Sequence, residues 1–379
     1  MFITGGSDSY WVIPLLFDPI PKDRIDDFYD FRDELRLFVD HVVRSRLTVV
    51  SGLRRTGKTS LVKVGLSLVN APYIYLDTRF TIYPGFEDIA RVIGKSLEDS
   101  LRRHTNLREA LASYLKMVKG VTIGLKDYSV SVVFRGNGKL DLQDLFLRLN
   151  EFGEDIGSPV ILVFDEAQDL RKATWARFDR FLAYVYDNLK YVNLTLTGSQ
   201  FGILKDFLGL EDPEAPLYGR PYLEVKTRRL SESEGAEFLR LGFEEARAHY
   251  NEELIREAVS RLDGIIGWLT FFGYSYITRT AGDLEEVFNK AVSLAGTELT
   301  NLLSELKSSR YRNVLKTLST GGMSWSELKK TLERVEGRTI EDKAFNEVLR
   351  RLSAFGLIEK VGENYVIIDP IYRAASANI

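Results

Sequence analysis

The chain has 379 residues, 45% of them hydrophobic and 28% charged, which is the balance of an ordinary globular protein. That length exceeds a single ordinary hydrophobic core and predicts two or three domains. A net charge of −3 does not favour a protein whose main role is to coat nucleic acid. The absence of cysteine excludes disulfides, thiolate metal sites and cysteine nucleophiles, and three scattered histidines make a histidine metal site or triad improbable.

Two features bear on cellular location. No apolar run approaches the roughly 20 residues that a transmembrane helix needs. The first ten residues lack the basic and then apolar pattern of a signal peptide. We therefore expect a cytoplasmic protein that does not associate with a membrane.

Short apolar segments alternate with helical periodicity over residues 1–227. The continuous apolar segments are typical of strands buried on both faces of a parallel sheet. Their alternation with helices predicts a layered α/β domain. The candidate strands are Leu47–Ser51, Tyr73–Leu76, Val160–Phe164, Leu194–Thr197 and Tyr222–Val225, and the candidate helices between the first three of them are Leu61–Val69, Phe86–Arg103 and Asn106–Val118.

Two regions depart from this rhythm. Alternation with period two in Val121–Leu125 and Ser129–Phe134 predicts a β-hairpin inserted at about 121–134. It could serve as a surface for a protein partner or for self-association, or have only a structural role. Residues 228–307 are helical throughout and predict a helical lid domain.

Residues 308–379 predict a winged helix, because three helices are followed by a hairpin. The chain is thus expected to divide into a core (1–227), a lid (228–307) and a winged-helix domain (308–379). The last domain's candidate elements are the helices Tyr311–Ser319, Trp325–Arg334 and Lys343–Ala354 and the strands Leu357–Val361 and Tyr365–Ile368.

Residues 52–59 carry a phosphate-binding motif. The run GLRRTGKT fits G-x-x-x-x-G-K-[ST] between a candidate strand and a candidate helix, which is the context the motif requires. Its glycines let backbone N–H groups point at phosphate oxygens, and the helix adds the positive end of its dipole. Lys58 is then expected to contact the β- and γ-phosphates of ATP, and Thr59 to bind Mg²⁺. The residues expected to bind ATP or ADP here are Gly52, Arg54, Arg55, Thr56, Gly57, Lys58, Thr59 and Ser60.

An acidic pair, Asp165 and Glu166, follows the apolar segment Val160–Phe164. Open α/β sheets bind ligands at the carboxyl ends of their strands, where this pair is expected to lie. Asp165 is predicted to hold Mg²⁺ through its water shell, and Glu166 to polarise an attacking water. The pair favours hydrolysis over phosphoryl transfer to a metabolite; the alternative is a solvated turn.

Three more polar residues are candidates for sensing the γ-phosphate. Thr197 and Ser199 follow the fourth candidate strand, although Thr197 could instead pack in the core and Ser199 cap the next helix. Arg220 precedes the last strand, where an arginine can reach a γ-phosphate of its own subunit or of a neighbour. A surface role is the alternative. With Lys58 and Glu166, Arg220 completes the predicted catalytic set.

The runs LRRTGKTSL, DEAQ, TGS and LYGR together resemble the archaeal ATPase family, in the STAND branch of AAA+-like P-loop NTPases. The resemblance extends from about Pro19 to the C-terminus. It implies a five-stranded parallel sheet of the ASCE type, a helical lid and a C-terminal winged helix, with adenine near Phe31–Phe38. In the lid, GIIGW has isoleucine where relatives commonly show Gly-x-Pro, and no lid arginine is identified as a second sensor. The lid is therefore expected to report nucleotide state through packing.

The leading functional hypothesis is a switch in which ATP or ADP holds the lid and winged helix against the core and slow hydrolysis releases them. The second is an ATP-regulated DNA-binding protein, since the third helix of a winged helix can enter a major groove. Acidic neighbours and the net charge count against DNA. A helicase, suggested by DEAQ, lacks a SAT motif and an arginine-rich final motif. The candidate DNA-contacting residues are Lys343, Asn346, Arg350 and Arg351, and their acidic neighbours are Glu341, Asp342 and Glu347.

Overall fold

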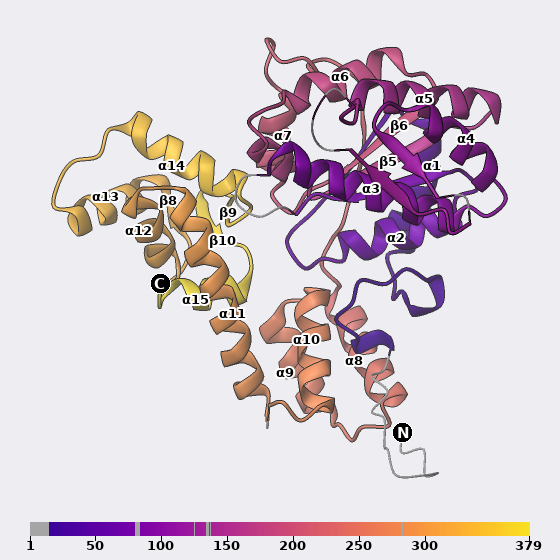
Figure 1. Ribbon diagram of the computed structural model, residues 1–379. Helices are drawn as coiled ribbons and strands as arrows, with labels where there is room; N and C mark the ends of the chain where they lie inside the picture. The colour runs from indigo at the N-terminus through magenta and orange to yellow at the C-terminus, as the bar shows by residue number, and fades with distance from the viewer. Residues whose placement is uncertain (1–14, 80–83, 125, 134–135, 137, 282) are drawn as a thin grey trace. The chain divides into compact units, whose positions relative to one another are not determined.

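The structure is a computed structural model that describes residues 15–79, 84–124, 126–133, 136, 138–281 and 283–379 (Figure 1). The first ten residues, expected to carry no signal peptide, lie outside this range. Among the described residues, no helix is long and apolar enough to cross a membrane. The chain forms two compact units: a sheet unit of residues 31–52 and 58–227, and a lid–wing unit of residues 53–57, 228–379 and those before Phe31. The three-domain division stays a prediction.

A five-stranded parallel sheet forms the centre of the sheet unit, in the strand order β2-β5-β6-β1-β7. Every residue of β1, β5 and β6 is buried, as expected when helices cover both faces. The order puts the carboxyl ends of β2, β5 and β6 side by side. The predicted α/β sheet is thus confirmed. Its strands are β1 (Leu47–Ser51), β2 (Tyr73–Asp77), β5 (Val160–Asp165), β6 (Val192–Thr197) and β7 (Leu223–Lys226).

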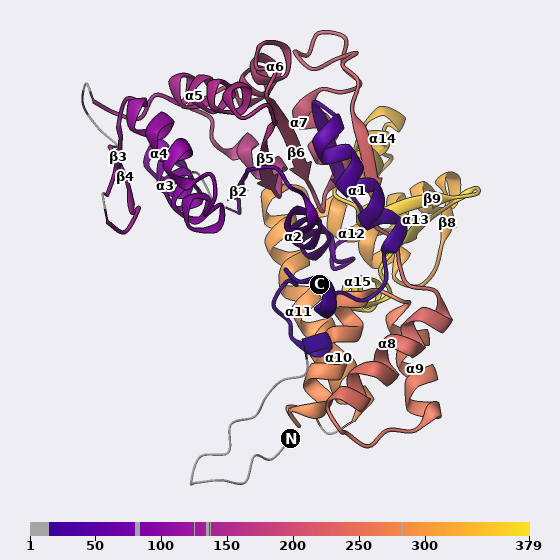
Figure 2. The ribbon, with the colours of Figure 1, turned by 90° about the vertical axis from the view of Figure 1, so that its right-hand side faces the viewer.

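Helices cover the two faces of this sheet (Figure 2). Helices α1 and α2 pack together against β1, while α5 and α6 pack against β6 from the opposite face. Phe38 of α1 fills the space where a Cβ of Gly65 in α2 would stand, 2.2 Å from its ring, so this helix pair requires a glycine. The helices are α1 (Arg32–Arg44), α2 (Lys58–Leu68), α3 (Phe86–Arg103), α4 (Arg108–Met117), α5 (Leu142–Asp155), α6 (Phe178–Asn188) and α7 (Phe201–Leu208).

The expected hairpin is present as two short antiparallel strands, β3 (Val121–Ile123) and β4 (Val130–Val132). Its predicted ends at Leu125 and Phe134 lie outside the described residues. Strand β3 packs against α4 and β4 against α3, where Val132 lies 2.9 Å from the position of a Cβ on Gly94. Because the unit's own helices cover one face of the hairpin, a structural role accounts for its apolar residues.

The lid–wing unit is helical apart from a small antiparallel sheet in the order β8-β10-β9. Its longest helix, α11, contacts α10 and also α15, and at about 1.5 Å per residue its 22 residues span roughly 33 Å (Figure 1). The elements are α8 (Glu232–Glu245), α9 (Glu252–Leu262), α10 (Ile266–Ile277), α11 (Leu284–Glu305), α12 (Ser309–Leu318), β8 (Met323–Ser324), α13 (Trp325–Glu336), α14 (Asp342–Ala354), β9 (Ile358–Val361), β10 (Asn364–Ile367) and α15 (Pro370–Ser376).

Helix α15 was not expected from the sequence, although its start carries a clear signal. Asp369 caps it by accepting hydrogen bonds from the backbone of Ile371 and Tyr372, and Pro370 occupies the first turn. The helix is short, and it begins only three residues after strand β10 ends. A helix of seven residues needs tertiary contacts for stability, here those with α11.

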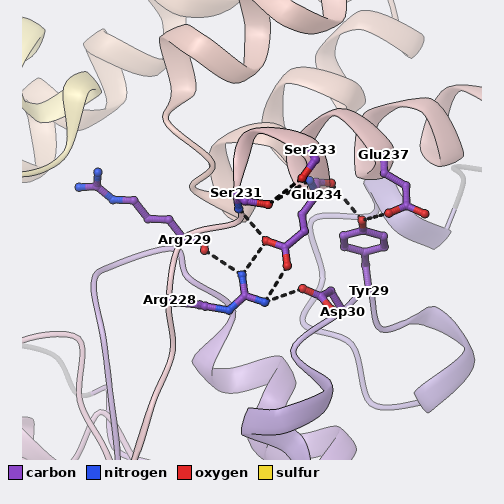
Figure 3. Close-up of polar contacts among 8 residues, drawn as sticks. All are labelled: Tyr29, Asp30, Arg228, Arg229, Ser231, Ser233, Glu234 and Glu237. Carbon is purple, nitrogen blue, oxygen red and sulfur yellow. Dashed lines mark hydrogen bonds and ion pairs between the residues drawn. The ribbon is translucent and has the colours of Figure 1, made fainter.

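Arg228, the first residue of the lid–wing unit after β7, is held by acids from two segments (Figure 3). Its guanidinium lies 2.7 Å from the carboxylates of both Asp30 and Glu234. Glu234 also closes the capping box of α8, accepting from the Ser231 backbone at 2.6 Å. Tyr29 donates to Glu237 at 2.9 Å. Asp30 is the last residue before the chain enters the sheet unit, and Arg228 is the first residue after β7 at which it returns to the lid–wing unit. Their ion pair therefore holds together two of the points where the chain passes between the units.

Glu234 provides a test of this cluster through pH. Hydrogen bonding to Arg228 lowers the pKa of Glu234 from 4.5 to about 2, so its charge stabilises the fold above pH 4.5 and this is lost as the pH falls towards 2. Glu234→Gln should lower stability at pH 7 by up to about 1 kcal/mol, because the pair is partly exposed. Between pH 4.5 and 2 the variant should lose less stability than wild type in urea unfolding.

The control for this experiment is Glu232→Gln, in the same helical turn, which should follow the wild-type pH dependence. Parallel pH curves for wild type and Glu234→Gln would contradict the assignment of Glu234 to the ion pair.

Candidate nucleotide-binding site

Asp165, the last residue of β5, is 1% exposed and lies at the centre of the candidate site. Its Oδ2 accepts hydrogen bonds from the Thr59 hydroxyl at 3.1 Å and the Tyr75 hydroxyl at 2.6 Å. Its Oδ1 accepts a short hydrogen bond from Thr197. Since a buried carboxylate is costly unless hydrogen-bonded, donors from α2, β2 and β6 together make this position tolerable.

The next residue, Glu166, has φ of 56°, a left-handed conformation that is uncommon outside glycine. This turn directs its backbone N–H to the hydroxyl of Thr197 at 2.9 Å. Its Oε2 accepts from the Ser199 backbone at 3.1 Å, the Ser199 hydroxyl at 2.8 Å and Gln168 Nε2 at 2.5 Å. Burial by itself raises the pKa of Glu166, but the charge of Lys58 and these hydrogen bonds outweigh it and lower the pKa. Glu166 is therefore an ionised, oriented carboxylate.

The structure thus brings together Thr59, Asp165, Glu166, Thr197 and Ser199, all of them candidates from the sequence. Thr197 is fully buried, as the packing alternative expected, and it also bonds the acidic pair. That Thr197 and Ser199 sense the γ-phosphate stays a prediction. Ser199 donates to Glu166 and does not cap α7, whose N-cap residue is Gln200.

Two residues of the network, Tyr75 and Gln168, were missed in the sequence. Tyr75 lies in an apolar segment read only as a strand, and its role depends on the parallel pairing of β2 with β5. Gln168 does stand in the DEAQ run two residues after Glu166, which was a usable signal. Burial and the charge of Asp165 raise the pKa of the Tyr75 hydroxyl, so this group keeps the proton that it donates to Asp165.

The phosphate loop has the backbone expected of its glycines. Gly52 and Gly57 have φ of 143° and 80°, which other residues rarely adopt. Lys58, 6% exposed, begins α2 and donates to the Gly52 carbonyl at 3.1 Å, and Ser60 lies in the same helical turn. The Thr56 hydroxyl closes the loop internally on the Leu53 carbonyl at 2.8 Å.

The two loop arginines, Arg54 and Arg55, group with the lid–wing unit. Arg55 makes an ion pair there with Glu298, and the Nε of Arg54 is buried. Their predicted role in phosphate binding therefore stays a prediction, because the described ion pair of Arg55 is with a residue of the lid–wing unit.

Arg220 is not brought to the acidic pair. Its guanidinium is bound by Asp187 at the end of α6, at 2.6 and 2.8 Å, and by the carbonyl of Pro216. The hydrogen bonds that Arg220 donates to Asp187 raise the pKa of Arg220. The predicted adenine segment Phe31–Phe38 forms the start of α1, with Phe31, Leu35 and Phe38 buried in the unit.

The residues fit a magnesium–nucleotide ligand. Mg²⁺ prefers hard oxygen donors, and the Thr59 hydroxyl and Asp165 carboxylate that could hold it are hydrogen-bonded to each other. The start of α2 at Lys58 provides the helix N-terminus on which phosphate groups bind.

Comparison with known proteins identifies the family. The Walker-type ATPase PABY2304 of Pyrococcus abyssi is 31% identical, with a TM-score of 0.78, over 95% of this chain and 99% of that chain. The chain belongs to this archaeal family of Walker-type ATPases. The ORC2 protein of Aeropyrum pernix, solved with ADPNP and ADP, matches with a TM-score of 0.56 and 14% identity over 95% of this chain and 96% of that chain, which shows a shared fold. No curated protein matches.

The winged helix is supported by a separate match. The family model of the MCM protein C-terminal winged helix-turn-helix domain matches residues 305–368 of this chain. That range runs from the end of α11 to the residue after β10. The predicted P-loop fold with a C-terminal winged helix is confirmed.

Strand β6 offers a matched pair of substitutions at the site. Thr197→Val removes the hydroxyl that serves both Asp165 and Glu166 and should destabilise the protein by about 2 kcal/mol, because buried polar groups lose partners. Thr195→Val, on the same strand, removes a buried hydroxyl that has no hydrogen-bond partner among the described residues and should be neutral or stabilising. Urea unfolding measures both. Equal losses of stability would show that Thr197 acts only through packing.

Proposed function

We propose that this Walker-type ATPase binds ATP with Mg²⁺ and hydrolyses it slowly, as part of a nucleotide-controlled switch. The observation that carries the proposal is the acidic pair at the carboxyl end of β5. Asp165 accepts a hydrogen bond from Thr197 and Glu166 accepts one from Ser199, and the pKa of Glu166 is lowered. The pair suits metal-assisted attack of water on a phosphoryl group.

In this proposal each residue has a separate task. The loop from Gly52 to Ser60 cradles the phosphates, and Lys58 supports their negative charge. Thr59 and Asp165 hold Mg²⁺, which supplies further charge neutralisation when bound. Glu166 accepts a hydrogen bond from the attacking water and orients it, a role for which its lowered pKa suits it at neutral pH.

The present engagement of Glu166 supports slow turnover. Its Oε2 already accepts from Ser199 and Gln168, so binding a water at that oxygen requires these donors to release or share it. Thr197 is the last residue of β6 and Ser199 follows it by two residues. In this proposal a bound γ-phosphate displaces one of these hydroxyls from its carboxylate. Such a displacement would link hydrolytic competence to the presence of the γ-phosphate, which is what a switch requires.

The proposed roles predict different defects in two variants. Lys58→Ala should weaken nucleotide binding, whereas Glu166→Gln should keep binding and lose hydrolysis by a factor of roughly 100 or more. Phosphate release and titration with ATP measure the two properties. Glu154→Gln, exposed on α5, should behave as wild type. Equal turnover in all variants would exclude this site as the source of hydrolysis.

A DNA-binding regulator is the second candidate, because the matched family model is a winged helix-turn-helix domain. Two of the four candidate residues on α14 are already engaged within the chain. Arg350 pairs with Glu347 at 2.9 Å, and Asn346 accepts from Trp325 at 2.8 Å. Because these side chains already have partners within the chain, the contacts favour the nucleotide-controlled switch over a protein that reads DNA bases.

Duplex DNA therefore should not bind to the full chain with measurable affinity at about 50 mM salt, where charge-driven binding is strong. Fluorescence anisotropy of a labelled duplex provides the measurement. Salt-dependent binding that falls on Lys343→Ala and Arg351→Ala would reverse the order of the two candidates.

A further inference from the structure

Arg55 lies in the middle of the phosphate loop, and its side chain contacts helices of the lid–wing unit. Its φ of 61° is left-handed, a conformation that costs a non-glycine residue free energy and persists only where surrounding contacts hold it. The contacts of Arg55 therefore indicate what holds the loop in shape.

The guanidinium of Arg55 meets groups from three helices. Glu298 of α11 accepts both of its Nη groups, one at 3.1 Å and the other closer, which is the bidentate fork that arginine makes with a carboxylate. Tyr372 of α15 lies 3.4 Å from Nη1 and itself donates to Glu298. The face of Trp268 in α10 lies 4.1 Å from the guanidinium carbon, within cation–π range.

The backbone of Arg55 is bound as well as its side chain. Gly267 in α10 donates its N–H to the Arg55 carbonyl at 2.8 Å. A Cβ on Gly267 would stand 2.6 Å from the Cβ of Arg55 and 2.9 Å from its carbonyl oxygen, so only glycine permits this approach. The run GIIGW thus supplies the glycine whose backbone contacts the phosphate loop.

The partners of Arg55 are themselves fixed. Trp268, 1% exposed, donates its indole N–H to Asp369 at 2.9 Å, and Asp369 caps α15. One continuous set of contacts therefore runs from the loop through α10 and α11 to the helix that ends the winged-helix region.

We propose that Arg55 is a positioning residue, which fixes residues 53–57 of the phosphate loop on α10, α11 and α15 and so sets the loop for nucleotide binding. This rests on the proposed function, since only a phosphate ligand makes the loop's position matter. The basic group in these contacts is then supplied by the phosphate loop itself and not by a lid helix. Because coupling is reciprocal, a nucleotide that orders the loop also strengthens its hold on the lid helices.

Electrostatics support a clamp that persists through the neutral pH range. Burial by itself lowers the pKa of Arg55 and raises that of Glu298, but their mutual hydrogen bonds outweigh burial and move both values the other way. Both groups therefore remain charged in the folded protein.

Nucleotide affinity of the full chain tests the proposal. Arg55→Ala and Glu298→Gln should each weaken binding of Mg·ADP about tenfold, and the double variant should be no weaker than either single one, since all remove the same clamp. Arg55→Lys should lie between, because it keeps the charge over Trp268 but loses the fork. Glu285→Gln, an exposed glutamate at the other end of α11, is the matched control and should bind as wild type.

A second readout does not depend on nucleotide. Hydrogen exchange of the Gly267 amide, which donates to Arg55, should accelerate in Glu298→Gln and remain unchanged in Lys58→Ala. Dissociation constants within twofold of wild type for both clamp variants would overturn this proposal alone. Absence of Mg·ADP binding by the wild-type chain would overturn the proposed function as well.

Discussion

The site depends on one constraint: a carboxylate, Asp165, is buried at the carboxyl end of strand β5. In the low-dielectric interior such a group is tolerated only when its oxygens are fully engaged. The donors come from Thr59, Tyr75 and Thr197, on three different elements. The same requirement therefore aligns the start of α2 with the middle of β2 and the end of β6 and prepares a place where a cation could replace some of these hydrogen bonds.

The turn at Glu166 gives the two adjacent acids different hydrogen-bond partners. Its left-handed backbone directs the side chain toward Ser199 and Gln168, away from the donors of Asp165. Strand β6 serves both acids through Thr197 and Ser199. A change at the end of this strand would thus act on both carboxylates together, the one proposed to bind metal and the one proposed to orient water, which is why the proposed switch centres on it.

Within the lid–wing unit, Arg55 constrains residues 53–57 of the phosphate loop. The loop's glycines permit the required backbone, but they do not by themselves select it, because glycine is equally free to adopt others. The fork with Glu298 and the close approach of Gly267 restrict that freedom. Contacts within the lid–wing unit therefore hold Arg55, and contacts within the sheet unit hold Thr59.

The amino-acid sequence by itself determined the parallel sheet, the lid helices, the winged helix and the residues Lys58, Thr59, Asp165 and Glu166 as candidates. These follow from local information: continuous apolar segments, helical periodicity and a motif in which each residue type has its chemistry within a few positions. Only the tertiary structure decided which distant groups complete the site. Tyr75 reaches Asp165 because β2 pairs with β5, and Arg55 reaches Glu298 and Tyr372 across 243 and 317 residues of sequence. Arg220 pairs with Asp187 for the same reason, since packing chooses among many possible partners of a charge and no local pattern records that choice.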